Sequence, residues 1–524
     1  MAYVLVLLFL ALIYVCCHRR LFLRGLSKPP FPPSPDSFPF IGNLLDIPTQ
    51  NEIQVYHQWA RKFGAIMSVT VFGRSVIYLN SIAAAKDIFE KRSSNYSERT
   101  KLHMINDLMG WDWSFAMHPN DKYWRKCRKC VHDQFQPSSA RLFHPTHIRH
   151  AHALLRRMVD SPQDLEGNLR HYAAATVMGV AYGIQIADSG DRYVRAAEEA
   201  LQSVAIAGTP GAFLVDILPI LKYVPEWFPG ASFKRKAREW KRLSYEMRDA
   251  PFNAVKASLA RGEARPSFVT NHLEKLAAES QKINKSSIAE QEKIIKGSAG
   301  TVYAAGNDSI VGTLHTFFLA MILHPAVQCK AQAELDDVLV MDNGERRLPD
   351  YSDRSNLPYI DAVLKEVLRW APVAPLGLPH MAKNDDTYDG YLIPAGSLIV
   401  GFVWEMLHDP SVYTDPSSFS PERFLPKEDG RNPEPDPSQV AFGFGRRICP
   451  GRHMGSAALW IAITSFLASF DISPAINPDT GLEEEVKVGF TSGLVCHPLP
   501  FTYRITPRSE NAVAHIRQTA DFES

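Results

Sequence analysis

The spacing of apolar and polar residues predicts a mostly helical chain with a few short strands. Apolar–polar alternation over residues 65–80 predicts a β-hairpin that turns near Gly73 and Arg74. Between residues 371 and 403, short apolar runs separated by proline and glycine predict a small sheet. One large α-rich domain is expected, because helical periodicity with few breakers covers residues 82–92, 121–134, 147–159, 167–182, 192–206, 231–260, 286–324 and 359–370.

The start of the chain has the pattern of a membrane anchor. Residues 2–17 contain no charged side chain, and together with Leu21–Leu23 they are marginal but adequate for a thin bilayer. The segment lacks the positive n-region and the small-residue cleavage site of a secretory signal, although a secreted protein remains the alternative. The positive flank follows the segment at His18, Arg19, Arg20, Arg24 and Lys28. By the positive-inside rule we expect a single-pass anchor in the endoplasmic reticulum membrane, with the remainder in the cytosol.

A proline-rich segment follows the anchor. Prolines stand at positions 29, 30, 32, 33, 35 and 39, and this density favours a stiff polyproline-II spacer, while a plain linker stays open as the alternative. We therefore expect residues 1–24 to form the anchor and its basic flank, residues 25–43 a hinge, and residues 44–524 a single large domain.

Composition and charge exclude some classes of function. The 524 residues are 45% hydrophobic and 22% charged, which is typical of a globular protein, and the formal net charge is +1. Without a strong basic field, no nucleic-acid partner is expected. The seven cysteines are too scattered for a disulfide framework, which favours a reducing compartment for the folded part.

A single cysteine lies in a glycine-rich loop, Phe442–Gly451, near the C-terminal end. Arginines precede Cys449, and Pro450 and Gly451 follow it. Glycines allow a close backbone approach, and nearby cations favour the thiolate form that ligates metals. Such a loop could present a thiolate to a flat cofactor whose carboxylates the arginines neutralise. An inert cysteine in an ordinary turn is the alternative that the loop alone leaves open.

A basic helical stretch around residues 121–134 carries a second candidate site. Trp124 and Arg128 are four residues apart and share one helix face, where the indole N–H and the guanidinium form a donor pair for a carboxylate. A solvated basic helix is the alternative. Cys127 and Cys130 lack a second ligand pair, so no zinc site is expected. Histidines are interpreted as surface or packing residues at positions 144, 147, 150 and 152.

The longest helical stretch contains small and polar residues in its middle. Small residues beside an acid and a hydroxyl can open a groove in a helix and hold a proton relay, while a polar interruption on an exposed face is the alternative. Glycine inside a helix costs about 1 kcal/mol relative to alanine, so Gly306 indicates close approach by another group. The run in question is Ala305-Gly306-Asn307-Asp308-Ser309.

A third motif pairs Glu366 with Arg369 on one helix turn. The spacing alone is weak, because Glu239 and Arg242 have it too. Only the first pair is followed by a proline-rich β stretch, the run Pro421-Glu422-Arg423-Phe424 and then the Cys449 loop. Arg423 could complete a charged triad with Glu366 and Arg369 that pins this loop.

In combination these motifs resemble those of the cytochrome P450 family. They follow the family's order over most of the chain, the anchor and hinge are similar to those of its microsomal members, and residues 441–451 are most similar to fungal ones. The resemblance rests on Trp124-x-x-x-Arg128, Ala305-Gly306-Asn307-Asp308-Ser309, Glu366-x-x-Arg369, Pro421-Glu422-Arg423-Phe424 and Phe442-x-x-Gly445-x-Arg447-x-Cys449-x-Gly451.

The resemblance implies a fold that is mostly α with small β-sheets and that binds heme b. Cys449 would be the axial thiolate ligand of the iron, in the loop that ends at Gly451, and Phe442 would shield the sulfur. Ala305 and Gly306 would lie over the oxygen site, and a structural triad would steady the loop. The propionates would be bound by Trp124, Arg128, His380 and Arg447; the protons would come from Asp308 and Ser309; the triad would be Glu366, Arg369 and Arg423.

The resemblance also implies the reaction and its partners. The chain would be a monooxygenase that takes electrons from NADPH through a cytochrome reductase, with cytochrome b5 as a further candidate donor. The reductase would dock on Arg125, Lys126, Lys129 and Arg446. Ser309 stands where threonine is usual in the family; the hydroxyl is kept, but the methyl that restricts its rotamer is lost.

The expected substrate is a lipophilic small molecule, such as a terpenoid among fungal secondary metabolites. Two other functions stay open. One is a heme-thiolate isomerase or dehydratase that uses no external electrons, and the other is a non-catalytic heme-binding protein at a membrane surface. The substrate expectation rests on segments that are apolar and carry few charges, with Val204, Ala205, Ile206, Leu214, Val302, Leu376, Leu378, Leu494 and Val495.

Overall fold

The structure is a computed structural model that describes residues 29–48, 50–208, 212–216, 218–282, 284–341, 346–427 and 430–520. The expected membrane anchor and the first residues of the hinge lie outside the described residues. The chain divides into two compact units. The smaller unit combines the described residues up to Glu98 with Pro379–Phe402, and the larger unit comprises Arg99–Leu378 and Val403–Ser524.

The smaller unit contains a four-stranded sheet in the order β1-β2-β6-β3. β1 (Ile66–Val71) and β2 (Arg74–Leu79) form the predicted antiparallel hairpin. β6 (Leu398–Gly401) pairs in parallel with β2 and antiparallel with β3 (His380–Met381), while β4 (Asp386–Tyr388) and β5 (Tyr391–Ile393) form a separate hairpin. The small sheet predicted within residues 371–403 is thereby confirmed. The helices of this unit are α2 (Glu52–Phe63), α3 (Ile82–Lys86) and α4 (Ser93–Tyr96).

The described part of the hinge is attached to this sheet. The N–H of Ser68 donates to the carbonyl oxygen of Pro33 over 2.8 Å, and the Ser68 hydroxyl donates to that of Pro32 over 2.8 Å. The amide of Asn43 donates to the carbonyl oxygens of Pro35 and Asp36. Proline lacks an N–H but keeps its carbonyl, so these residues can accept bonds from the edge strand β1.

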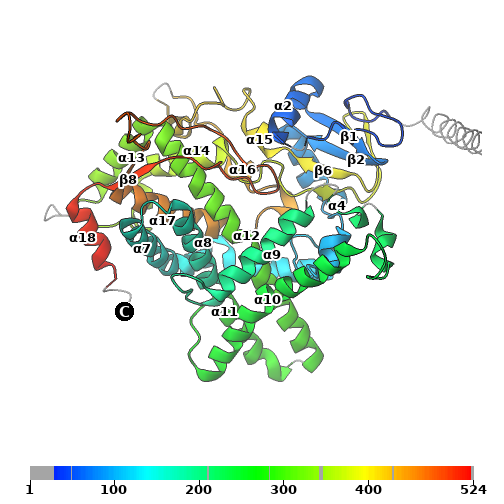
Figure 1. The fold of residues 1–524 in the computed structure, drawn as a ribbon, viewed down its shortest axis with the longest axis horizontal. Helices are drawn as coiled ribbons and strands as arrows, with labels where there is room; N and C mark the ends of the chain where they lie inside the picture. The colour runs from blue at the N-terminus through cyan, green and yellow to red at the C-terminus, as the bar shows by residue number, and fades with distance from the viewer. Residues whose placement is uncertain are drawn as a thin grey trace, which may run out of the picture. The chain divides into compact units, whose positions relative to one another are not determined.

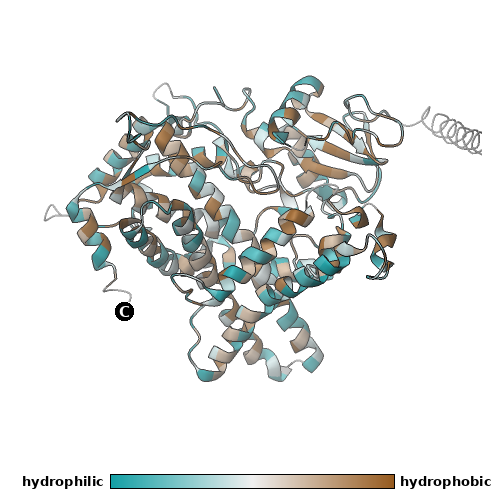
Figure 2. Cartoon of the chain, in the orientation of Figure 1, coloured by the Kyte–Doolittle hydropathy of each residue, from teal (hydrophilic) through white to brown (hydrophobic). Residues whose placement is uncertain are grey.

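The larger unit is built around α12 (Lys285–Leu323), which is buried along most of its second half. α8 (Leu165–Tyr182) packs along it, and α7 (His144–Asp160) covers α8 and contacts α17 (Arg452–Ser469), as Figure 1 shows. Other helices against α12 are α5 (Lys122–Phe135), α10 (Ser232–Arg261), α11 (Phe268–Glu279) and α14 (Pro358–Trp370). In Figure 2 hydrophilic residues follow α10, whereas strands β1 and β2 of the smaller unit are hydrophobic.

Most predicted helices are confirmed. The stretches at 121–134, 147–159, 167–182, 231–260, 286–324 and 359–370 are α5, α7, α8, α10, α12 and α14; that at 192–206 is α9 (Arg192–Gly208), and that at 82–92 is α3 with a π-helical turn over Asp87–Lys91. Helices that the periodicity did not predict include α2, α11, α13 (Pro325–Val338), α17 and α18 (Glu510–Gln518). β7 (Phe470–Ser473) and β8 (Arg504–Pro507) pair near the C-terminal end.

Within the part of the chain that the structure describes, no single helix has the length and apolar composition to cross a membrane. Among the described helices, only α12 and α13 taken together, across a bend of 105°, meet those two criteria.

Candidate active site

The Cys449 loop connects α16 (Ser438–Ala441) to α17 in the larger unit. Gly443 and Gly445 have φ values of 76° and 54°, in the left-handed region that glycine adopts without a steric penalty. The N–H of Cys449 donates to the carbonyl oxygen of Phe442 over 2.8 Å and closes the loop. Because α17 begins at Arg452, the thiol lies beside the positive end of a helix dipole, which favours an anionic sulfur.

The surroundings of the Cys449 sulfur suit a metal-bound thiolate. Burial raises the pKa of the Cys449 thiol, while the backbone N–H groups of Gly451 and Arg452 and the guanidinium groups of Arg128 and Arg452 lower it. Burial lowers the pKa of Arg128, and the nearby Cys449 raises it. A metal ion deprotonates a coordinating thiol outright, and the cations then neutralise the remaining charge. An inert cysteine in an ordinary turn, the alternative named above, would not require this concentration of cations.

The predicted carboxylate-binding residues lie beside this loop. Trp124 and Arg128 come from one face of α5, and Arg128 lies close enough to Cys449 for their charges to interact. The Arg447 guanidinium lies over the Trp124 ring, 4.2 Å from its centroid, and its Nη2 donates to the carbonyl oxygen of His118 over 2.8 Å. The structure therefore brings Trp124, Arg128, Arg447 and Cys449 together.

Arg99 is a residue of this site that the sequence reasoning missed. It is 7% exposed, and its guanidinium donates to the carbonyl oxygen of Leu378. Burial holds the pKa of Arg99 well below its usual range, and the charge of Arg447 lowers it further. A bound carboxylate would offset the repulsion between these two guanidinium groups. No motif surrounds Arg99 in the sequence, so only the fold reveals its place.

Two further predicted heme contacts have well-defined surroundings. Phe442 is half-buried against the hydrophobic core of the larger unit. His380 lies in β3 of the smaller unit, where its Nδ1 is 2.6 Å from the carbonyl oxygen of Tyr96 and its ring lies 4.2 Å from that of Phe89. The propionate contact of His380 stays a prediction.

The small residues of α12 divide between two faces. Ala305 is exposed within the mostly buried second half of α12, and Ala304 and Gly306 beside it are half-buried, so an open space borders the helix there. Gly306 faces α8 instead, because a Cβ at Gly306 would lie 3.1 Å from Cγ2 of Val177. The close approach that Gly306 indicated is therefore made by a helix. The Ser309 hydroxyl donates within α12 to the carbonyl oxygens of Ala305, over 3.0 Å, and Gly306, over 3.3 Å.

Asp308 has a partner that the sequence reasoning also missed. Its Oδ1 lies 3.1 Å from Nε2 of His497, which belongs to the loop between β7 and β8. The Asp308 side chain is 38% exposed and that of His497 is 19% exposed. A histidine that lies 189 residues further along the chain than its partner gives no periodic signal in the sequence.

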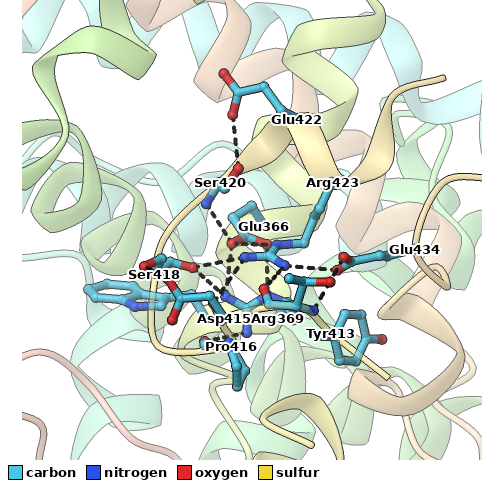
Figure 3. A network of polar contacts seen from close by, with 12 residues as sticks. Glu366, Arg369, Tyr413, Asp415, Pro416, Ser418, Ser420, Glu422, Arg423 and Glu434 are labelled. Atoms are coloured by element: carbon cyan, nitrogen blue, oxygen red, sulfur yellow. Dashed lines mark hydrogen bonds and ion pairs between the residues drawn. The ribbon is translucent and has the colours of Figure 1, made fainter. Parts of the chain in front are cut away.

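The predicted charged triad is formed, as Figure 3 shows. Arg369 Nε lies 2.8 Å from Glu366 Oε2, and Arg423 Nε lies 3.1 Å from Glu366 Oε1. Glu366 and Arg369 are fully buried, whereas Arg242 of the pair with the same spacing is 67% exposed and contacts Glu246. The sequence context therefore separated the two pairs correctly.

The network reaches beyond the three predicted residues. Arg423 also contacts Glu434, with Nη1 and Oε2 2.8 Å apart, so two carboxylates face two guanidinium groups. The remaining N–H groups of Arg369 donate to the carbonyl oxygens of Leu407, Pro416 and Ser418. These bonds hold Leu407, Pro416, Ser418 and Glu434, which precede α16 and the Cys449 loop in the chain.

Comparison with known proteins decides which family this site represents. A family model described as cytochrome P450 matches residues 32–504. The chain belongs to the cytochrome P450 family. The match extends over nearly all of the described chain, including both compact units.

Named P450 relatives come from fungi, as the sequence indicated. Cytochrome P450 monooxygenase 98 of Postia placenta is 43% identical over 509 residues, which are 96% of this chain and 95% of that protein. A cytochrome P450 monooxygenase of Armillaria gallica is 43% identical over 514 residues, 97% of each chain. Cytochrome P450 monooxygenase COX2 of Coprinopsis cinerea is 38% identical over 492 residues, 94% of this chain and 92% of that one. The predicted class of heme-thiolate monooxygenase is thereby confirmed.

The residues present fit the heme that the P450 family implies. The thiol of Cys449 is a soft ligand suited to iron. It lies in a loop where Gly443 and Gly445 have no side chains that could block a flat cofactor. Arg128 and the pair Arg99 and Arg447 supply cationic donors for two carboxylates, and Trp124 packs beneath Arg447. The open space beside Ala305 leaves room for a bound cofactor next to α12.

Proposed function

We propose that this P450 is an NADPH- and dioxygen-dependent monooxygenase that hydroxylates a lipophilic small molecule. The supporting observation is the Cys449 thiol at the start of α17, with Arg128 and the Arg447–Trp124 stack beside it. When bound, the heme supplies the redox-active iron at which dioxygen is reduced, with Cys449 as its electron-donating ligand. One oxygen atom enters a C–H bond of the substrate and the other leaves as water, so two electrons and two protons are consumed.

In this proposal the residues of the larger unit hold the cofactor and move protons. Arg99, Arg128, Arg447 and Trp124 bind and orient the carboxylates of the heme through charge and N–H donors. Asp308 and Ser309 on α12 supply protons at the oxygen site, because cleavage of an O–O bond requires them where bulk water is excluded. The Ser309 hydroxyl donates to the carbonyl oxygen of Ala305 over 3.0 Å, so it must rotate away from its own helix to take part.

The electrons come from NADPH through a cytochrome reductase, with cytochrome b5 as a second donor. Arg125, Lys126, Lys129 and Arg446 are exposed, which supports a basic docking surface for such acidic partners. Lys126 already contacts Glu290, with 2.6 Å between Nζ and Oε1, so it would exchange this partner on docking.

The proposed substrate class is a terpenoid or a similar lipophilic secondary metabolite. The support is the apolar character of segments that the resemblance to the P450 family implies are near the substrate, including Val302, Leu376 and Leu378. We also propose that residues 1–24 anchor the enzyme in the endoplasmic reticulum membrane with the catalytic domain in the cytosol. Protease treatment of intact microsomes tests this topology, since a cytosolic domain is digested and a lumenal one is protected.

Labelled dioxygen tests the proposed reaction. The enzyme is co-expressed with a reductase and given a panel of terpenoid precursors under ¹⁸O₂. We expect hydroxylated product that carries one ¹⁸O atom and forms only with NADPH. Product that forms without NADPH or without dioxygen would instead indicate an isomerase or dehydratase. A heme-loaded protein that consumes no NADPH with any precursor would indicate a heme-binding protein without catalysis.

A further inference from the structure

A line of titratable side chains connects the surface of the larger unit with Asp308. Asp308 and His315 are seven residues apart on α12 and share one helix face. His497 lies between them: its Nε2 is 3.1 Å from Oδ1 of Asp308, and its ring centroid is 6.5 Å from that of His315. Glu166, at the start of α8, is exposed, and its carboxylate accepts from Arg170 over 2.7 Å.

The charges of these groups influence one another's pKa values. The hydrogen bond from Arg170 is the main reason that the pKa of Glu166 is lowered, and the charges of His315 and His497 lower it further. Burial lowers the pKa of His315 to about 4, against the raising effect of Glu166. His315 therefore stays neutral at physiological pH. The histidine in direct contact with Asp308 is His497.

The backbone holds His497 in this position. A Cβ at Gly312 would lie 2.7 Å from Cγ2 of Val373, 3.2 Å from the carbonyl oxygen of Cys496 and 3.4 Å from Cε1 of His497. The missing side chain of Gly312 thus lets the Cys496–His497 segment cross α12 in direct contact. The N–H of Cys496 donates to the carbonyl oxygen of Val373 over 2.8 Å, and the N–H of His497 donates to Oγ1 of Thr491 over 2.9 Å.

We propose that His497 is a positioning residue that holds Asp308 and returns protons to it from water on the Glu166 side. The inference rests on the proposed function, in which Asp308 supplies protons. In the transfer, a protonated imidazole ring of His497 gives its Nε2 proton to Oδ1 of Asp308. The neutral ring keeps its Nδ1 proton and regains a proton at Nε2 from a hydronium ion of the solvent, which becomes water, so one proton enters for each proton passed on and no electrons move.

The proposal makes a prediction about pH. Imidazole is the side chain that ordinarily changes charge between pH 5 and 8. The charged or titratable groups around His497 are Asp308 and His315 of α12, Glu166 and Arg170 of α8, and the neighbouring thiol of Cys496. Because the donating form of the ring carries the extra proton, the supply of protons through His497 falls as the pH rises.

The test compares His497→Gln with the wild type as holoenzymes, at saturating reductase, by the rate of NADPH-driven dioxygen consumption between pH 6 and 8. Glutamine keeps an N–H donor for Asp308 but cannot relay a proton. We expect the variant to be roughly tenfold slower at pH 6, less than the 10²–10⁴-fold that a direct general acid contributes. The ratio of wild-type to variant rates should fall as the pH rises, because the proposed step needs the protonated ring.

Three further arms separate a proton relay from a merely structural contact. His515→Gln on α18 is the matched control and should keep the wild-type rate and pH profile. In an Asp308→Asn background, His497→Gln should cause no further loss of rate, because His497 acts through Asp308. In the ferric resting enzymes, the Tm shifts of His497→Gln and Asp308→Asn should be non-additive, which reports the contact without turnover.

A rate ratio near one, or a ratio independent of pH, would overturn the inference, as would additive Tm shifts. If His497→Gln does not fold, Gly312→Ala is measured instead, since it displaces the Cys496–His497 segment while the chain keeps both the Asp308 and the His497 side chains. A wild-type rate in that variant also overturns the inference. A wild type with a thiolate heme but no NADPH-driven dioxygen consumption would refute the proposed function itself.

Discussion

At the scale of single residues, Glu366 decides the charge balance of a buried network. Its two oxygens face Arg369 and Arg423, and Oε1 also accepts from the N–H of Ser420 over 2.8 Å. With Glu434 included, two negative charges meet two positive ones in a region from which water is largely excluded. A buried pair adds little net stability, but removal of one partner leaves an uncompensated charge.

We therefore expect Glu366→Gln to destabilise the protein by about 3–5 kcal/mol. Glu422→Gln is the matched control: it is 42% exposed and contacts Lys330, and its loss should cost at most about 1 kcal/mol. Urea unfolding followed by far-UV circular dichroism measures both. Equal effects of the two substitutions would contradict the role given to the buried network.

The residues of the site differ in how well the sequence predicted them. Glu366, Arg369 and Arg423 were predicted because their spacing and order form a motif, and Trp124 and Arg128 because they share a helix face. Arg99, Glu434 and His497 were not, because each meets its partner only through the tertiary fold. Tertiary contacts between distant segments leave no local pattern.

At the scale of elements, two glycines of α12 serve different neighbours. Gly306 faces the Val177 side chain of α8, where a Cβ would come within 3.1 Å. Gly312 faces Val373 and the backbone of Cys496, where a Cβ would come within 2.7 and 3.2 Å. A side chain can yield by a small shift more readily than a backbone segment tied by hydrogen bonds.

Gly312→Ala should accordingly lower the free energy of unfolding by about 1–3 kcal/mol, the usual cost of overpacking. Gly306→Ala should stay within about 1 kcal/mol of the wild type, since the gain in helix propensity offsets the contact with Val177. Thermal unfolding of the two variants side by side provides the comparison. A greater loss in Gly306→Ala would show that α8 yields less than the Cys496 segment.

Helix α17 shows why periodicity predicted some elements and missed others. All of its residues from Ala457 to Leu467 are buried, so it has no polar stripe to set a helical period. α5 and α14, in contrast, bury one face and were predicted with ends within two residues of those observed. Amphipathic surface elements can be read from the sequence, whereas an element buried on all sides gives only a run of apolar residues.

At the scale of the whole molecule, buried histidines make stability depend on pH. Burial lowers the pKa of His147 on α7 to about 3 and that of His150 to about 4. The sequence left these residues as surface or packing histidines, and both are packing residues. In the unfolded chain a histidine titrates near pH 6.5.

The unfolded state therefore binds more protons than the folded state between about pH 6.5 and pH 4. Stability is fully present above pH 6.5 and is lost as the pH falls, by up to about 1.4 kcal/mol per pH unit for each histidine. Urea unfolding at pH 7, 6 and 5 should show this slope, and His147→Gln should reduce it. An unchanged slope in the variant would show that His147 is protonated in the folded protein.

The whole account depends on Cys449 as the axial ligand of a heme. The most direct measurement is the absorption spectrum of the ferrous–CO complex in the wild type, in Cys449→His and in the control Cys329→Ser, which changes an exposed thiol. We expect the red-shifted band of a thiolate-ligated heme in the wild type and the control, and its loss in Cys449→His with heme still bound. Retention of that band in Cys449→His would contradict the assignment of the active site.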